Sequence, residues 1–268
     1  MRLRRRAEDV VVRRTAAKSP LRRMLYRWVD LADRLAAPRR SRLAPPAALR
    51  FRVHGDLDLD GFLESGRQCS VDIQAALASV ERDLSSFRSV LDFGCGCGRT
   101  LQWLAASVDD AALYGTDIDE EAIDWCAKSV LGASFAVNAG RPPLAYPDAS
   151  FDLVYAVSVF THLTESLQLD WLSELRRVTA PGGLVVVTVR GTSYASQLAP
   201  RDRQELATQG FVYSPMPAYF QQLFPSWYQT ATMSEEYIRR TWSPWLEVLR
   251  HVPRGLDGGQ DIVVLRKP

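Results

Sequence analysis

Between residues 89 and 190 the chain alternates short apolar runs with amphipathic stretches. The amphipathic stretches, at residues 99–107, 120–130 and 166–178, repeat apolar side chains at helical spacing. The short runs have the length and the β-branched content of buried strands; they cover residues 90–93, 112–116, 134–137, 151–157 and 184–189. Strands that alternate with helices predict a parallel sheet with helices on both faces. Two later runs, 246–250 and 261–265, predict a hairpin on its edge, which makes seven strands.

The N-terminal part of the chain has a different pattern. An apolar stripe with helical spacing begins after Pro20 and predicts an amphipathic helix; it contains Leu21, Met24, Leu25, Trp28, Leu31, Ala32 and Leu35. Pro38 ends this helix, and a linker leads to a second helical stretch at residues 66–84. We therefore predict a basic, helical extension over residues 1–48 and a main α/β domain over residues 49–268.

The strand and helix alternation stops between residues 191 and 244. This segment and Trp245 hold 11 of the 26 aromatic residues. One interpretation is an insertion that caps a ligand pocket before the last two strands. The other is ordinary packing of irregular segments on the sheet.

Composition limits the class of protein. A chain of 268 residues with 47% hydrophobic side chains can bury a full core. No apolar run approaches the 18 or so residues of a membrane span, and Arg13 and Arg14 interrupt the run at residues 10–12, as a signal peptide would not. The four cysteines have neither zinc-site nor disulfide-framework spacing. These features predict a cytoplasmic protein with reduced thiols and no metal.

Positive charge is concentrated at the start of the chain. Residues 1–42 contain 14 Lys and Arg but four Asp and Glu, whereas the whole chain has a formal net charge of only +2. A solvated extension explains such an arm, and so does contact with an anionic membrane surface or an acidic partner. We expect no nucleic-acid partner.

The strand at 90–93 leads into closely spaced glycines and then into a helix. The sequence Asp92-Phe-Gly-Cys-Gly-Cys-Gly-Arg99 lets backbone approach a ligand closely and points helix amides at an anionic group. Dinucleotide-binding loops have the spacing G-x-G-x-x-G, which would require glycine where this chain has Arg99. The loop therefore argues against a nicotinamide cofactor.

This loop resembles motif I of the class I methyltransferases, and later residues extend the resemblance. Asp117 and Ile118 follow the second strand as in the family's second motif, and Asn138-Ala139 match the site that contacts adenine, with Asn in place of the more frequent Asp. Residues 144–163 are similar to the family's fourth-strand region, and 175–183 to the turn before strand five. The resemblance implies a Rossmann-like, seven-stranded, mostly parallel sheet and S-adenosyl-L-methionine as cofactor.

The span from residue 49 to the C-terminus also resembles a bacterial subgroup associated with sugar and natural-product pathways. The residues that carry this resemblance are Gly66-Arg67-Gln68-Cys69, Trp227-Tyr228, Arg254-Gly255-Leu256 and Gln260-Asp261. It implies a small-molecule acceptor, which we expect to be a sugar-containing or other secondary metabolite methylated on oxygen. N- or C-methylation and a non-catalytic cofactor-binding scaffold remain alternatives.

The resemblance implies the cofactor-binding residues. They are Asp92, Gly94, Cys95, Gly96, Asp117, Ile118, Asn138 and Ala139. Arg67, on the helix before the sheet, is a further candidate as a partner of the methionine carboxylate, and a surface arginine is the other interpretation of it. Asp117 can accept hydrogen bonds from both ribose hydroxyls, and Asn138 from the adenine amino group. Cys95 and Cys97 fit as small side chains beside glycine rather than as reactive thiols.

His162 is the candidate general base, because it follows the fourth strand, where many class I enzymes place groups that face the acceptor. An imidazole with a pKa near neutrality can take a proton from an acceptor hydroxyl or amine. Capping of the helix that follows is the other interpretation. Ser158 and Tyr194 are weaker candidates, and His54 and His251 weaker still.

Overall fold

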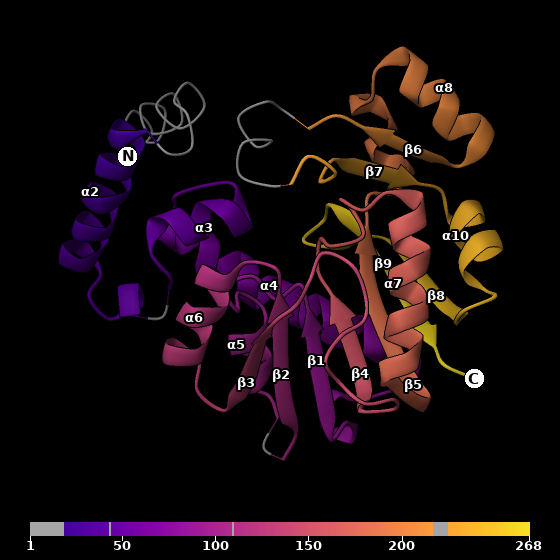
Figure 1. Cartoon of the computed structure of the whole chain (residues 1–268), viewed down its shortest axis with the longest axis horizontal. Coiled ribbons are helices and arrows are strands. Elements are labelled where there is room, and N and C mark those ends of the chain that lie inside the picture. Colours follow the sequence, from indigo (N-terminus) through magenta and orange to yellow (C-terminus); the bar gives the residue numbers. More distant parts are fainter. Residues whose placement is uncertain (1–18, 43, 109, 217–224) are drawn as a thin grey trace.

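The computed structural model describes residues 19–42, 44–108, 110–216 and 225–268, and its centre is a seven-stranded sheet (Figure 1). The strands are β1 (Ser89–Phe93), β2 (Ala112–Asp117), β3 (Ala133–Val137), β4 (Phe151–Ala156), β5 (Thr179–Val189), β8 (Glu247–Leu256) and β9 (Gln260–Arg266). Their order is β3-β2-β1-β4-β5-β9-β8. The first five strands are parallel, and β9 is antiparallel to both β5 and β8. This confirms the predicted fold class.

Helices cover both faces of the sheet. The helices of the described residues are α2 (Pro20–Ala36), α3 (Ala47–His54), α4 (Leu59–Ala78), α5 (Leu101–Ala105), α6 (Glu120–Ser129), α7 (Glu165–Val178), α8 (Pro200–Gln209) and α10 (Glu235–Trp242), with short 3₁₀ turns at Arg40–Arg42, Leu84–Ser86 and Thr192–Gln197. Helices α4 and α5 share one apolar cluster with the strands, and α7 and α10 share the other. No helix in the described part of the chain is long and apolar enough to cross a membrane.

Side-chain alternation explains why the central strands are apolar along their whole length. On β1, Val90 packs into the cluster of α4 and α5, and the next residue, Leu91, packs into the cluster of α7 and α10. On β4, Leu153 likewise packs into the cluster of α4 and α5, and Val154 packs into the cluster of α7 and α10. Both faces of a central parallel strand are buried, so a continuous apolar run is needed.

The C-terminal hairpin differs from the predicted one in length. Strand β8 continues to Leu256, so only the last part of the turn-rich segment 253–259 forms the turn. The pairing shifts between Val252 and Leu256, and Arg254 has a φ of 54°. A bulge therefore absorbs the residues that the sequence pattern assigned to a longer loop.

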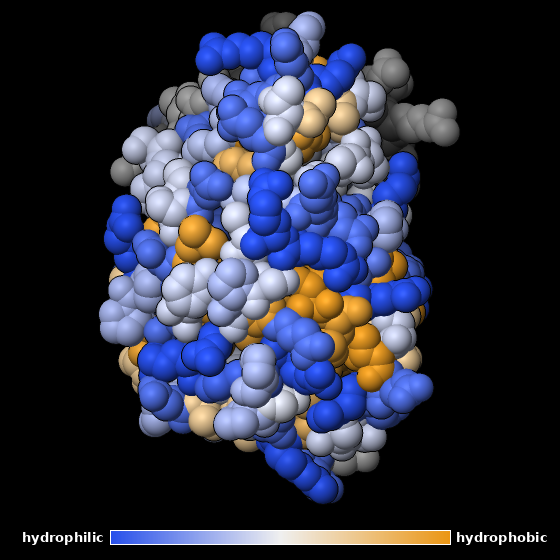
Figure 2. Space-filling view, turned by 90° about the vertical axis from the view of Figure 1, so that its right-hand side faces the viewer, coloured by the Kyte–Doolittle hydropathy of each residue, from blue (hydrophilic) through white to orange (hydrophobic). Residues whose placement is uncertain are grey.

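Strand β8 is an exposed edge of the sheet. Figure 2 faces this side of the molecule, where hydrophilic residues cover most of the surface and separate a larger apolar area from smaller ones. Arg266 on β9 forms an ion pair with Glu247 on β8, at 2.6 Å. Charged side chains at an edge oppose pairing with the strands of another molecule.

The N-terminal extension is attached to the main domain through α3. Asp33 of α2 forms a 2.5 Å ion pair with the buried Arg50, and Asp30 accepts a hydrogen bond from the Ala47 amide at 2.7 Å. The boundary predicted between residues 48 and 49 falls inside α3, which is one continuous helix. The extension and the domain therefore share a helix.

The insertion after β5 is folded, which its sequence pattern did not predict. It contains α8, α10 and a two-stranded antiparallel ribbon of β6 (Phe211–Ser214) and β7 (Thr230–Met233), which lies above the carboxyl ends of the sheet strands (Figure 1). Two of its aromatic residues, Tyr237 and Trp242, are buried in the cluster beside α7. Ordinary packing therefore accounts for some of the aromatics; the site described below accounts for others.

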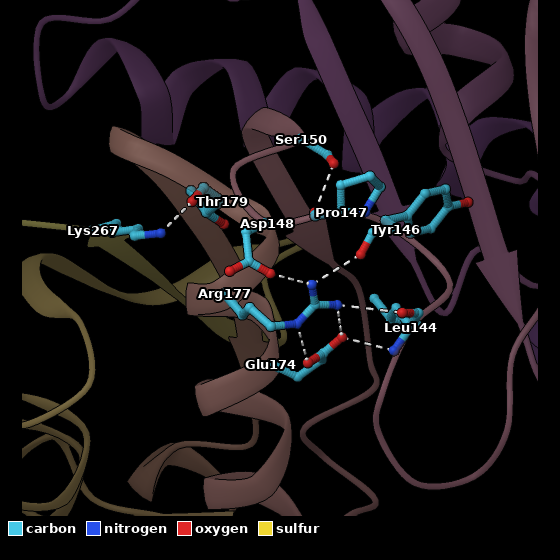
Figure 3. A network of polar contacts seen from close by, with 9 residues as sticks. All are labelled: Leu144, Tyr146, Pro147, Asp148, Ser150, Glu174, Arg177, Thr179 and Lys267. Atoms are coloured by element: carbon cyan, nitrogen blue, oxygen red, sulfur yellow. Dashed lines mark hydrogen bonds and ion pairs between the residues drawn. The ribbon is translucent and has the colours of Figure 1, made fainter.

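A polar network holds the loop before β4 against the C-terminal turn of α7 (Figure 3). The Arg177 guanidinium donates to both carboxylate oxygens of Glu174, to Asp148 and to the backbone carbonyls of Leu144 and Tyr146. Glu174 is only 7% exposed and also accepts from the Leu144 amide at 2.7 Å. Burial alone would raise the pKa of Glu174, but these hydrogen bonds and the Arg177 charge hold it below its usual value.

Replacing Arg177 with alanine is expected to lower the free energy of unfolding at pH 7 by about 2–3 kcal/mol, because a largely buried carboxylate loses its charged partner. The lowered pKa of Glu174 stabilises the fold above the ordinary glutamate pKa, and this contribution disappears as the pH falls through the lowered value. The deficit should therefore shrink in acid. Urea unfolding at pH 7 and pH 4 measures it, with the exposed neighbour Arg176→Ala as control. Equal losses in both variants would contradict the assignment.

Candidate cofactor and acceptor site

The glycine loop between β1 and α5 adopts a backbone conformation that needs glycine at the positions where the sequence has it. Gly94 and Gly96 have φ values of 74° and 53°, in the left-handed region. A Cβ on Gly94 would lie 2.2 Å from Val159, and one on Gly96 would lie 2.7 Å from Val53. The amides of Gly94 and Cys95 donate to the Thr116 carbonyl and fix the loop against β2.

Asp117, at the end of β2, lies directly against this loop. Its Oδ2 accepts from the Gly96 amide at 2.7 Å, and its Oδ1 accepts from the Asp119 amide at 2.9 Å. Burial raises the pKa of Asp117. Each carboxylate oxygen has a further lone pair, so the side chain can still accept from two hydroxyl groups of a ligand.

Asn138 follows β3 and lies beside Asp117. Its backbone amide donates to the Asp117 carbonyl at 3.0 Å, and its side-chain oxygen accepts from the Thr116 hydroxyl at 2.9 Å. The Asn138 amide nitrogen donates to the Ala139 carbonyl. Asn138 and Ile118 line a cavity, whereas Ala139 does not and Gly140 takes that place.

Asp92 is buried at the end of β1, with 2% of its surface exposed. The Tyr155 hydroxyl donates to its Oδ2 at 2.9 Å. Burial raises the pKa of Asp92 to about 8, and the nearby Asp117 charge adds to the shift. A cation bound beside Asp92 favours its ionised form, because opposite charges lower the pKa of an acid.

These residues meet at a cavity of about 450 Å³. Asp92, Gly94, Cys95, Gly96, Asp117, Ile118 and Asn138 line it, so the structure brings together seven of the nine cofactor-binding candidates. Trp227 and Tyr228 of the insertion complete the wall. The cap interpretation of the insertion therefore holds for these two aromatic residues.

Two arginines lie on the same cavity, and neither was predicted there. Arg52 of α3 pairs with Asp119 at 3.0 Å and Glu121 at 2.5 Å, and so joins α3 to the start of α6. Arg99 donates to the Ser65 hydroxyl at 2.5 Å, and its buried Nε has no hydrogen-bond partner among the described residues. The cavity thus contains one guanidinium that is available to an anionic ligand group.

Arg67 does not lie on this cavity. Its side chain is 47% exposed and pairs with Glu64, one turn earlier on α4. Arg99 therefore lies where a carboxylate partner of the ligand was expected, and Arg67 does not. Arg99 stands directly after the last glycine of the loop, and this position is the sequence signal that could have placed a guanidinium on the cavity. In the sequence it served only as evidence against a dinucleotide-binding loop.

A second cavity, of about 490 Å³, adjoins the first. It is lined by four of the five candidate acceptor-facing residues, His54, Ser158, His162 and Tyr194. Five residues line both cavities: Arg52, Val53, Arg99, Ser158 and Tyr228. His251 lies elsewhere, paired with Glu235 and Asp261.

Ser158 lies at the junction of the two cavities in a strained conformation. Its φ is 61°, which is uncommon for a residue other than glycine. Its amide donates to the Thr188 hydroxyl at 2.7 Å, and Gln260 hydrogen-bonds to the hydroxyls of both Thr188 and Ser158. Strain held by surrounding contacts is typical of functional positions. Gln260, 102 residues away, could not be linked to Ser158 from the sequence.

His162 is held in one orientation. Its Nδ1 lies 2.7 Å from the Gln229 carbonyl, which requires a proton on Nδ1, and its ring stacks on Tyr228 with centroids 4.2 Å apart. Its Nε2 has no hydrogen-bond partner among the described residues. Burial lowers the pKa of His162 to about 4, and the Arg190 charge adds to this effect. Thr164 caps α7 with its hydroxyl, so His162 is not the side chain that caps this helix.

Comparison with known proteins agrees with this geometry. Residues 90–183 match the family model described as a methyltransferase domain. Residues 90–183 therefore form a methyltransferase domain. The match ends inside β5, before the insertion begins.

Curated relatives of this domain have various names. The chain is 29% identical to methyltransferase GfsG of Streptomyces halstedii, over 50% of this chain and 48% of that protein. It is 33% identical to a fatty-acid O-methyltransferase of Mycolicibacterium smegmatis, over 42% of this chain and 39% of that protein. The chain thus spans less than half the length of these two relatives. A solved methyltransferase from Methanosarcina mazei has the same fold, with a TM-score of 0.51 and 18% identity. The match covers 67% of this chain and 92% of that chain.

The family and fold imply S-adenosyl-L-methionine as the cofactor, and the methyltransferase domain has residues that fit it. Asp117 and Asn138 offer acceptors for hydroxyl and amino groups, Asp92 offers a carboxylate for a cation, and Arg99 offers a guanidinium for a carboxylate. No cluster of three His, Cys, Asp or Glu side chains suited to a metal ion occurs in the described residues. All four cysteines are buried and free.

Proposed function

We propose that this protein transfers a methyl group from S-adenosylmethionine to an oxygen atom of a small molecule bound in the second cavity. The observation that carries the proposal is the shared wall of the two cavities, which includes Arg99, Ser158 and Tyr228. A cofactor in the first cavity and an acceptor in the second would meet at this wall. Proximity and alignment then supply most of the acceleration.

Four residues of the first cavity have distinct roles in this proposal. Asp117 binds the ribose hydroxyls, Asn138 accepts from the adenine amino group, and Arg99 pairs with the methionine carboxylate. The bound cofactor supplies a methyl group activated by its positive sulfonium centre. Ionised Asp92 orients that end of the ligand through its charge and the loop backbone.

His162 is the group proposed to remove the acceptor proton. With Nδ1–H held by the Gln229 carbonyl, Nε2 is the basic atom, and it can take the hydroxyl proton as the oxygen attacks the methyl carbon. The ring reaches the second cavity beside Ser158. Tyr228 stacks on the ring and keeps it in this orientation.

The second cavity supports a hydroxylated acceptor. Besides Arg99, its walls present polar groups on several elements, including His54, Ser65, Asp257 and Gln260. Relatives named as methyltransferases of fatty acids and of 2-methyl-6-phytyl-1,4-hydroquinone act on small molecules, which agrees with this class of acceptor. We propose a sugar-containing or other secondary metabolite, and a cytoplasmic location in keeping with four free thiols.

The test has two parts. S-adenosylhomocysteine is expected to raise the melting temperature, because a ligand that binds only the folded state stabilises it, and NAD is expected to have no effect. Labelled S-adenosylmethionine is then incubated with a panel of hydroxylated small molecules, and transfer of label to oxygen is expected. Stabilisation by NAD alone would reject the cofactor assignment. Stabilisation by the homocysteine nucleoside without transfer to any acceptor would favour the non-catalytic scaffold, and label on nitrogen or carbon would correct the acceptor atom.

A further inference from the structure

Helix α2 presents most of the apolar stripe predicted from the sequence to solvent, whereas Leu25 of that stripe packs on the domain. Leu21, Met24, Leu31 and Leu35 are 54%, 67%, 56% and 76% exposed, and Trp28 is 51% exposed. These five residues are spaced three and four apart and therefore share one side of the helix. We call this side the outer face of α2.

The opposite side of α2 is fixed to the domain by buried contacts. Val29 is 2% exposed, and the Arg22 guanidinium lies 5.0 Å from the centre of the Phe51 ring on α3. The ion pair of Asp33 with the buried Arg50 sets the rotation of the helix. Turning α2 to bury its outer face would leave Arg50 without this carboxylate, which is costly for a buried charge.

Charge on α2 is divided between the two sides. Both acidic residues of the helix, Asp30 and Asp33, point inward to Ala47 and Arg50. Arg23, Arg27 and Arg34 are exposed, follow one edge of the outer face, and form no ion pair within the described residues. The outer side of α2 therefore combines an apolar stripe with uncompensated positive charge.

We propose that the outer face of α2 docks this protein on an anionic lipid bilayer. An amphipathic helix with leucine, methionine and tryptophan on one face and arginine beside them is suited to lie in the plane of a bilayer interface. A helix of 17 residues is too short and too polar to span it. The cationic edge of α2 complements the negative charge of the lipid headgroups. Docking into a neutral groove of another protein would not require this positive charge.

Docking there would place the bilayer on the side of α2 that faces away from α3. Helix α3 packs on α2 and supplies Arg52 and Val53 to both cavities and His54 to the second. The outer face thus belongs to a helix that packs on a helix of the site, but it contains no residue of the site itself. Variants of the outer face can therefore be tested without altering the proposed chemistry.

The experiment measures sedimentation of the full chain with vesicles. Wild type is expected to bind vesicles of phosphatidylcholine and phosphatidylglycerol in equal parts, and to bind pure phosphatidylcholine at least tenfold more weakly. Leu31→Gln combined with Leu35→Gln is expected to weaken binding to the mixed vesicles at least tenfold, because two apolar side chains leave the interface. Arg23→Gln, Arg27→Gln and Arg34→Gln together should weaken it by about fivefold for each charge.

Matched controls separate the outer face from the rest of the surface. Val71→Gln with Leu131→Gln changes two exposed apolar residues elsewhere, at 44% and 87% exposure, and should leave binding within twofold. Thermal stabilisation by S-adenosylhomocysteine shows that each variant is folded. A chain that starts at Ser19 should still depend on Leu31 and Leu35.

Three results would overturn the proposal. One is the absence of binding to the mixed vesicles. Another is binding that the leucine variant retains but that removal of residues 1–18 abolishes, which would assign it to the basic arm alone. The third is a self-association of wild type, seen by sedimentation velocity and abolished by the leucine variant, which would make a second copy the occupant.

Discussion

Replacing His162 with alanine is expected to lower turnover roughly 10²- to 10⁴-fold with little change in cofactor affinity, the usual contribution of a positioned general base. His162→Asn serves as the packing control, because its amide can still donate to the Gln229 carbonyl but it has no basic nitrogen. Both variants should be similarly slow if Nε2 accepts the proton. Single-turnover rates together with calorimetry of S-adenosylhomocysteine binding measure the two effects separately.

The pH profile adds a second criterion for His162. Burial lowers its pKa to about 4, so the ring is neutral and able to accept a proton throughout the range from pH 6 to 9. Turnover that depends on this ring should rise with pH only near pH 4 and be flat above it, not rise near the ordinary imidazole pKa of about 6.5. Near-normal turnover in both variants would leave positioning as the source of catalysis, with the proton lost to solvent.

Replacing Asp117 with alanine is expected to weaken binding of S-adenosylhomocysteine roughly 10- to 150-fold, since hydrogen bonds to a charged group contribute about 1.5–3 kcal/mol. The variant also removes the acceptor of the Gly96 amide. Asp117→Asn keeps one acceptor oxygen for that amide and is expected to fall between wild type and alanine.

Titration calorimetry decides the role of Asp117. The exposed Asp124 on α6 provides a control for the loss of one negative charge, and Asp124→Ala should bind within twofold of wild type. Unchanged affinity in Asp117→Ala would mean that the ribose lies elsewhere. An equal loss in both variants would mean that net charge, and not this carboxylate, governs affinity.

The sheet could be predicted from the sequence because its signals are local. Strands β1 and β4 are apolar runs with turn residues on both sides. The left-handed backbone of the glycine loop depends on the glycines of the loop itself. Asp117 is implied by the resemblance to the family's second motif, and as the last residue of β2 it lies at the edge of the sheet where ligands bind. These features needed no knowledge of distant contacts.

The rest of the site depends on contacts between distant segments. Arg52 reaches Asp119 across 67 residues, and Gln260 reaches Ser158 across 102 residues. Arg67 precedes the sheet on a helix that can face the cofactor, but its position on that helix turns its side chain to solvent beside Glu64. The ribbon of β6 and β7 was missed because its strands are only four residues each and lie within an irregular segment.

The two ends of the segment 191–231 lie side by side next to the end of β5. Arg190, directly after β5, forms a β-bridge with Thr232, and the Met233 amide donates to the Arg190 carbonyl at 2.9 Å. Segments whose ends meet in this way can change length or be replaced without shifting the register of the strands beside them. Replacing residues 191–231 would therefore exchange Tyr194, Met216 and Tyr228 in the wall of the second cavity, while Arg52, Arg99 and Gln260 in the same wall would stay in place.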